Sequence, residues 1–164
     1  HPNFDYNAAL HAIVPSSHAE IVINTETVKT ETMPVLYAQA DVFCVISRAE
    51  AFGLTYLEAM ACGLPCISGT YGGMSDFLNN DNSWLITPSQ HKQATDQSPL
   101  YEGINWAEYN VNDVRKALRQ AFKNKDEVTQ KSIKAVETAQ QFTWEASAKI
   151  LKNIIEEKKG GDTV

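Results

Sequence analysis

Residues 47–71 read SRAEAFGLTYLEAMACGLPCISGTY, and this stretch carries the clearest structural signal in the chain. The apolar run before it, residues 41–46, predicts a buried β-strand. Residues 54–62 predict a helix, and Gly63 ends that helix where a C-terminal glycine is expected. Gly53 therefore marks a junction of strand, loop and helix N-terminus. In open α/β sheets such a junction binds anions, because unpaired N–H groups and the helix dipole point at the ligand.

Two carboxylates, Glu50 and Glu58, stand eight positions apart on the two sides of Gly53. Glu58 falls four residues after Leu54 and three before Ala61, with apolar neighbours nearly all round, so we expect it to be buried and to need a partner. The alternatives are a helix glutamate that turns to solvent and, at Glu50, an ordinary loop acid. Acids beside an anion site favour recognition of hydroxyl groups next to a phosphate, as in a sugar nucleotide.

The rest of the first half alternates between short apolar runs and helical patterns. The runs predict strands and the patterns predict helices: strands at residues 19–23, 65–68 and 83–86, and helices at residues 3–14, at residues 32–39 and from the turn at residues 71–74 through Leu78. Continuous apolar strands separated by helices predict a parallel sheet covered on both faces. The expected fold class is therefore α/β, a Rossmann-like doubly wound parallel sheet with a helical C-terminal segment.

Residues 87–105 break this pattern. They are polar, contain two prolines and lack a period, so we expect a long surface loop. Trp106, which follows them, indicates packing rather than ligand stacking.

The C-terminal third is predicted to be helical. Residues 112–123 predict one helix, residues 126–141 a second, and Thr143 is expected to cap a third. The apolar residues at helical spacing in the first of these helices predict its inner face, which consists of Val114, Leu118 and Phe122.

Composition narrows the function without naming it. The chain has 164 residues, 43% hydrophobic and 21% charged, as expected of a globular protein, and its net charge of −6 argues against nucleic acid or an acidic membrane as the main partner. No apolar run approaches the roughly 20 residues that span a bilayer. Three cysteines without a nearby histidine predict reduced core thiols rather than a metal site. A cytoplasmic location is expected, with peripheral attachment to the inner face of a membrane left open for a longer protein.

Four segments resemble one family. Residues 50–65, EAFGLTYLEAMACGLP, resemble the Glu-x7-Glu signature of retaining GT-B glycosyltransferases, the group that includes glycogen synthases and many mannosyl- and glucosyltransferases. Residues 33–43 resemble the helix and strand that lead into that signature, residues 71–78 its following Gly-Gly turn, and residues 142–145 the start of the family's last helix. The chain therefore resembles the C-terminal, donor-binding half of a GT-B fold from the family-four-like glycosyl transferases group 1.

The resemblance implies a role for each matching residue. Glu50 would be the catalytic glutamate, which contacts donor-sugar hydroxyls near the reacting carbon, and Glu58 would accept hydrogen bonds from the two ribose hydroxyls. Asp76 stands where the family commonly has a glutamate, so the resemblance supports a binding role for it only weakly. From the residues alone, the Gly-Gly pair is better read as a plain turn. The resemblance implies no metal ion and no cofactor. The other donor- and nucleotide-binding positions that it implies are Phe52, Gly53, Leu54, Thr55, Gly72 and Gly73.

The chain also departs from the family pattern. The matching region lacks the Arg and Lys with which the family neutralises the donor diphosphate, and the segment between Ile23 and Met33 is too short for a further strand and helix. We therefore expect one nucleotide-sugar-binding domain at residues 1–158, which begins partway through the family domain or belongs to a shortened branch, and a frayed tail at residues 159–164. The family's N-terminal acceptor domain would be missing, so the chain alone should bind a donor weakly and not catalyse transfer.

The leading hypothesis is the donor-binding half of a retaining glycosyltransferase. Such an enzyme would move a hexose from a UDP-, GDP- or ADP-sugar to an acceptor hydroxyl. A non-catalytic nucleotide-sugar-binding or regulatory module that kept the fold is a second hypothesis. Another GT-B enzyme, such as a phosphorylase or an epimerase, is a third.

Overall fold

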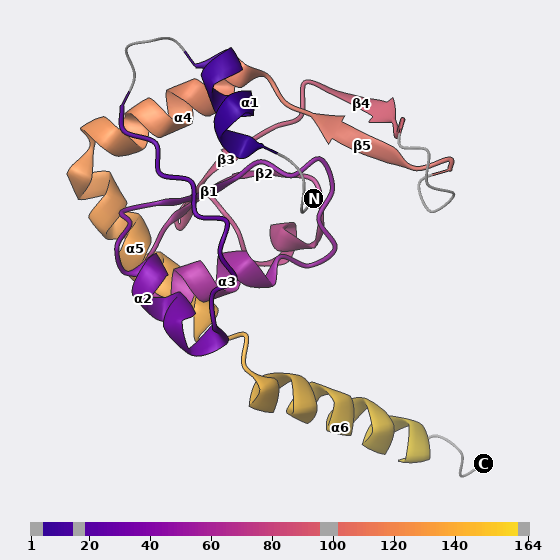
Figure 1. Cartoon of the computed structure of the whole chain (residues 1–164). Helices are drawn as coiled ribbons and strands as arrows, with labels where there is room; N and C mark the ends of the chain where they lie inside the picture. The colour runs from indigo at the N-terminus through magenta and orange to yellow at the C-terminus, as the bar shows by residue number, and fades with distance from the viewer. Residues whose placement is uncertain (1–4, 15–18, 96–101, 161–164) are drawn as a thin grey trace. The chain divides into compact units, whose positions relative to one another are not determined.

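The computed structural model describes residues 5–14, 19–95 and 102–160 of the chain. These residues fall into two compact units, His1–Thr32 and Met33–Val164. Figure 1 labels the elements of both units. All segments that resemble the glycosyltransferase signature belong to the larger unit, which therefore contains every candidate site residue.

The smaller unit contains helix α1 (Tyr6–Ile13) and the short 3-10 helix η1 (Thr30–Thr32). The helix predicted at residues 3–14 is confirmed within the described residues, and its predicted start at Asn3 lies outside them. The strand predicted at residues 19–23 is wrong, because these residues have no regular structure. A strand must pair its N–H and C=O groups with a neighbour, and the described residues of this unit offer no second strand.

A parallel three-stranded sheet in the order β1-β2-β3 forms the centre of the larger unit. In register, Phe43 lies opposite Cys66, and Cys66 lies opposite Ser83. All three strands lie where the sequence predicts them, and their parallel pairing confirms the predicted α/β class. The strands are β1 (Phe43–Val45), β2 (Cys66–Gly69) and β3 (Ser83–Ile86).

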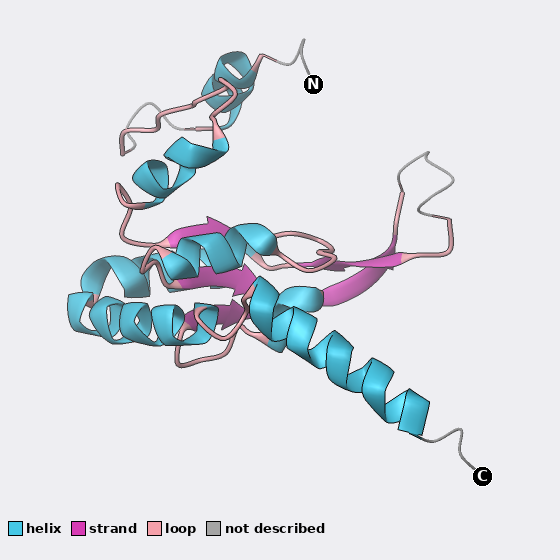
Figure 2. Cartoon of the chain, turned by 90° about the horizontal axis from the view of Figure 1, so that it is seen from below, coloured by secondary structure: helices cyan, strands magenta, loops and turns pink. Residues whose placement is uncertain are grey.

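Helices cover both faces of this sheet (Figure 2). On one face Cys66 of β2 belongs to the same hydrophobic cluster as buried residues of helix α3 (Leu54–Ala61). On the other face Ile67 joins a cluster with buried residues of helix α4 (Val111–Lys123). Neighbouring residues of a strand point to opposite faces, so β2, which is buried throughout, connects two packed layers. The doubly wound arrangement is confirmed.

The other predicted helices of the larger unit are present with small shifts of their ends. Thr143 caps the last of them, because its Oγ1 accepts a hydrogen bond from the Ala146 N–H at 3.1 Å. Residues 161–164 of the predicted tail lie outside the described residues. None of the helices in the described part of the chain is both long and apolar enough to cross a bilayer. The other predicted helices of the larger unit are α2 (Met33–Tyr37), η2 (Gly73–Asp76), α5 (Lys125–Ala139) and α6 (Trp144–Gly160).

The inner face of α4 differs from the predicted one. Ala117 and Ala121 are buried against the sheet, whereas Leu118 is 46% exposed and Phe122 is 77% exposed. Only Val114 of the predicted stripe packs at the edge of the core. Alanine lets the helix approach the sheet closely, so the small residues of α4 occupy the interface and the larger ones remain outside.

The prediction of one long loop at residues 87–105 is wrong at residues 90–93 and at Asn105, which belong to strands; the other described residues of this range are loop or turn. Strands β4 (Gln90–Gln93) and β5 (Asn105–Glu108) form an antiparallel hairpin beyond the carboxyl end of β3. Residues 96–101, between the two strands, lie outside the described residues. All four residues of β4 are exposed and polar, so the sequence shows none of the apolar–polar alternation that predicts a strand.

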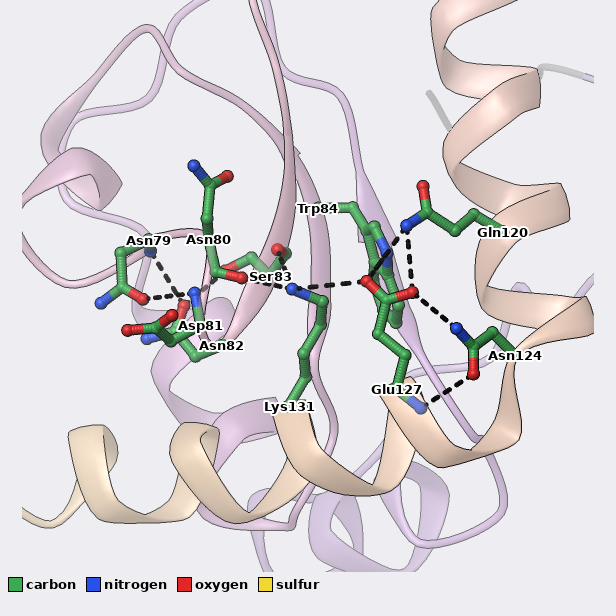
Figure 3. A network of polar contacts seen from close by, with 10 residues as sticks. All are labelled: Asn79, Asn80, Asp81, Asn82, Ser83, Trp84, Gln120, Asn124, Glu127 and Lys131. Atoms are coloured by element: carbon green, nitrogen blue, oxygen red, sulfur yellow. Dashed lines mark hydrogen bonds and ion pairs between the residues drawn. The ribbon is translucent and has the colours of Figure 1, made fainter.

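A buried lysine connects α5 to the amino end of β3 (Figure 3). Lys131 is 8% exposed, and its ammonium donates to the carbonyl oxygens of Asn80 and Ser83, the latter at 3.1 Å. Its charge is offset by Glu127, whose Oε1 lies 3.7 Å away and also accepts the Trp84 indole N–H at 3.0 Å. The donors and acceptors of this network satisfy one another, so it is a structural connection.

Replacing Lys131 tests that conclusion. Lys131→Met leaves two carbonyl oxygens and Glu127 without their shared donor, so the free energy of unfolding should fall by about 2 to 3 kcal/mol. Urea denaturation followed by circular dichroism measures the change. The control is Lys134→Met, which removes an exposed ion pair with Glu137 and should change stability little. Equal urea midpoints for the two variants would contradict a structural role for Lys131.

Candidate functional site

Gly53 opens helix α3 in the left-handed conformation, with φ at 95°. A Cβ at this position would lie 2.8 Å from the ring of Tyr56 and 3.3 Å from the Cβ of Met74, so both backbone and packing require glycine. No side chain caps α3, and the first N–H groups of a helix have no partner within it. Leu54 and Thr55, which form this first turn, are exposed. The N-terminus of α3 is therefore open to an anion.

The Gly72-Gly73 turn lies directly against the backbone of the segment that carries Glu50. The Gly73 N–H donates to the Glu50 carbonyl oxygen at 3.1 Å. A Cβ on Gly72 would overlap that same oxygen, and a Cβ on Gly73 would overlap the carbonyl oxygen of Ala51. The structure thus brings together the two glycines and the first motif glutamate, and their contact goes beyond what a plain turn requires.

The remaining predicted residues of this region lie around that contact. Glu50 is half-buried, and Phe52 is 40% exposed with its ring centroid 5.6 Å from that of Phe77. Asp76 is exposed at the end of η2, and its carboxylate has no hydrogen-bond or ion-pair partner within the described residues. Asp76 is therefore free to meet a ligand but is not positioned by a neighbour.

Glu58 is exposed, so the expectation that it is buried is wrong. Leu54, Glu58 and Ala61 do share one face of α3, as their spacing predicts, but that face is the outer one. The helix packs on the sheet through the opposite side, where Tyr56 and Met60 are fully buried. The apolar residues around Glu58 in the sequence therefore do not surround it in space.

Tyr37 of α2 holds the Glu58 carboxylate in place, a pair that no sequence pattern predicts. The buried Tyr37 hydroxyl donates to Glu58 Oε2 at 3.0 Å. Burial, followed by the hydrogen bond and the charge of Glu58, raises the pKa of Tyr37 to about 12. Tyr37 therefore stays protonated at neutral pH and remains a donor. The carboxylate keeps a fixed orientation while Oε1 is left for another partner.

A hollow of about 580 Å³ runs along the whole of β3, from Asn80 to Thr87, beside residues of α4 and α5. Its lining includes Ser83, Glu127 and Lys131, whose polar groups already bond with one another. In open α/β sheets ligands bind beyond the carboxyl ends of the strands. The carboxyl-end cluster of Glu50, Gly53 and the Gly72-Gly73 turn is therefore the better candidate site.

The sequence matches a known family over most of its length. The family model described as glycosyl transferases group 1 matches residues 18–124. The chain belongs to this family. One curated relative is D-inositol 3-phosphate glycosyltransferase from Kribbella flavida. It is 30% identical over 143 residues, which cover 82% of the chain.

Two solved structures share the fold. Sucrose-phosphate synthase from Thermosynechococcus elongatus has a TM-score of 0.62, at 23% identity over 82% of the chain. The Anabaena protein HepE in complex with UDP has a TM-score of 0.56, at 20% identity over 78% of the chain. The chain spans 29% of the length of the Kribbella relative, and 29% and 30% of the two solved chains. It corresponds to one part of these longer proteins.

The packing around Gly53 can be tested against a glycine in open space. Gly53→Ala places a side chain at a positive φ and against Tyr56, so it should cost more than the roughly 1 to 2 kcal/mol of the left-handed conformation alone. Gly103 also has a positive φ, of 76°, but its Cβ would meet nothing within 4 Å. Gly103→Ala should therefore show the conformational cost only. Equal losses in urea denaturation would show that the site around Gly53 is not closely packed.

Proposed function

We propose that this chain is the donor-binding half of a retaining glycosyltransferase. The reaction transfers a hexose from a nucleotide diphosphate sugar to an acceptor hydroxyl and keeps the anomeric configuration. The observation that carries the proposal is the convergence of Glu50, the uncapped N-terminus of α3 and the Gly72-Gly73 turn beyond the carboxyl end of the sheet. Membership of the glycosyl transferases group 1 family supports glycosyl transfer as the reaction of this site.

Each part of the site has a distinct chemical task. The N–H groups from Phe52 to Thr55 receive the diphosphate, because the positive end of the α3 dipole and its unpaired donors favour an anion. Glu50 contacts the donor sugar, and its negative charge stabilises the positive charge that develops at the reacting carbon. Gly72 and Gly73 close the far side of the sugar pocket, where a side chain would displace the Glu50 backbone.

Glu58 binds the ribose hydroxyls in this proposal. Its exposed carboxylate is accessible to a ligand, and the hydrogen bond from Tyr37 sets its orientation before the ligand arrives. A preorganised acceptor loses less conformational entropy on binding than a freely rotating one. Burial is therefore not needed for the role, and the acid is better placed for a ligand at the surface.

Departure of the diphosphate requires positive charge, which this chain supplies mainly through backbone N–H groups. The family's Arg and Lys, and the domain that binds the acceptor, belong to the remainder of the enzyme. The names of the similar proteins support a nucleotide sugar as donor, since one solved relative is in complex with UDP and a curated relative is called a glycosyltransferase. Titration with UDP, GDP and ADP identifies the base of the donor nucleotide.

Glu50→Gln in a full-length enzyme that contains this chain tests the catalytic role. Loss of the negative charge should lower kcat by about 100- to 1,000-fold while nucleotide affinity stays close to that of the unaltered enzyme. The control is Glu145→Gln, an exposed glutamate at the start of α6, which should leave kcat unchanged. Full activity of Glu50→Gln would contradict the catalytic role of Glu50. Binding of a sugar nucleotide without any transfer by the unaltered protein would favour a non-catalytic binding module. NMR of the product sugar shows whether the anomeric configuration is kept.

Titration of the full-length enzyme with UDP, GDP and ADP tests the ribose assignment. Glu58→Ala should weaken the preferred nucleotide by about 10- to 100-fold, because a charge-assisted hydrogen bond is lost. Tyr37→Phe should weaken it less, because the carboxylate remains but loses its orienting donor. The matched ligand is the 2′,3′-dideoxy form of the same nucleotide, which should bind the unaltered enzyme and Glu58→Ala equally. Unequal affinities for the dideoxy ligand would contradict a ribose contact.

A further inference from the structure

Arg48 is the only arginine or lysine between Lys29 and Lys92, and it stands two residues before Glu50. Its guanidinium does not lie free at the site. The Nε atom lies 3.1 Å from Glu108 Oε1, and the guanidinium carbon lies 4.8 Å from the centroid of the Trp106 ring. Both partners belong to β5. The charge of Arg48 is therefore offset by a carboxylate and directed toward the hairpin.

The backbone of Arg48 makes a second connection to the same strand. The Ala107 N–H donates to the Arg48 carbonyl oxygen at 2.8 Å, and Ala107 is fully buried. Side chain and main chain of one residue thus fasten the Glu50 loop to three successive residues of β5. A planar guanidinium suits this arrangement, because it can stack on an indole face and pair with a carboxylate at once.

The hairpin also holds the loop on the other side of the site. Tyr71, which directly precedes the Gly72-Gly73 turn, donates from its hydroxyl to the Asn105 carbonyl oxygen at 3.2 Å. Its ring centroid lies 4.9 Å from that of His91 on β4. Both loops that meet at the Glu50–Gly73 hydrogen bond are therefore attached to one hairpin.

We infer that Arg48 is a positioning residue, which fixes the Glu50 loop to the β4–β5 hairpin and does not itself neutralise the donor diphosphate. This inference rests on the proposed function, since it concerns the same site. The Arg48 side chain is 56% exposed, so its ion pair alone holds it weakly, but moving the guanidinium to a diphosphate would give up both the pair with Glu108 and the contact with Trp106. The hairpin thus holds the Glu50 loop in the position needed for transfer.

Steady-state kinetics of the full-length enzyme with Arg48→Met and Glu108→Gln test the inference. Each change should lower kcat about 10- to 100-fold through misplacement of Glu50, with nucleotide affinity within about twofold of the unaltered enzyme. The double variant should lose little more than either single one, because both remove the same connection. Arg48→Lys keeps the charge but not the planar fork, so it should not restore kcat. The control is Arg115→Met, on the exposed part of α4.

The outcomes separate this inference from its alternatives. Weaker nucleotide binding by Arg48→Met, with rescue by Arg48→Lys and no effect of Glu108→Gln, would make Arg48 a diphosphate ligand and overturn the inference. Unchanged kcat in Arg48→Met, in Glu108→Gln and in the double variant would overturn it as well. Should Arg48→Met fail to fold by circular dichroism, Glu108→Gln decides, because it changes one partly exposed group without changing its size. Failure of the unaltered enzyme to bind or transfer any sugar would instead contradict the proposed function.

Discussion

The hydrogen bond from the Gly73 N–H to the Glu50 carbonyl oxygen is the contact on which the rest of the site depends. It joins the loop after β1 to the loop after β2, two segments that only a parallel pairing of these strands brings to the same edge. The approach is so close that neither Gly72 nor Gly73 can carry a side chain without moving the Glu50 segment. The position of Glu50 is thus set by backbone contacts, and the proposed function assigns its side chain to the ligand.

Acidic side chains predominate at the proposed site. The proposed site has acids at Glu50 and Glu58 and an open helix N-terminus, while Arg48, a cation near it among the described residues, is paired with Glu108. A diphosphate would therefore meet backbone donors first and would need further positive charge from outside this unit.

The sequence predicts the centre of this fold well because its strands are continuous apolar runs and its glycines mark the turns. The sequence-based prediction is wrong where burial or strand pairing does not follow the apolar pattern. Alanines rather than Leu118 and Phe122 face the sheet in α4, β4 is wholly polar, and Glu58 lies on the outer face of a helix whose sequence is apolar on most sides. Tyr37 pairs with Glu58, 21 positions away, and Arg48 pairs with Glu108, 60 positions away. No local sequence pattern predicts such long-range pairs.

The most direct test of the account is a two-dimensional amide NMR titration of the isotope-labelled chain with UDP-, GDP- and ADP-sugars, a method suited to weak binding. We predict that the largest shifts for the preferred nucleotide fall on residues 50–58 and 71–73, around the N-terminus of α3. Shifts centred instead on the amino end of β3, around Ser83 and Lys131, would contradict it. So would an unchanged spectrum with a nucleotide sugar that the full-length enzyme uses.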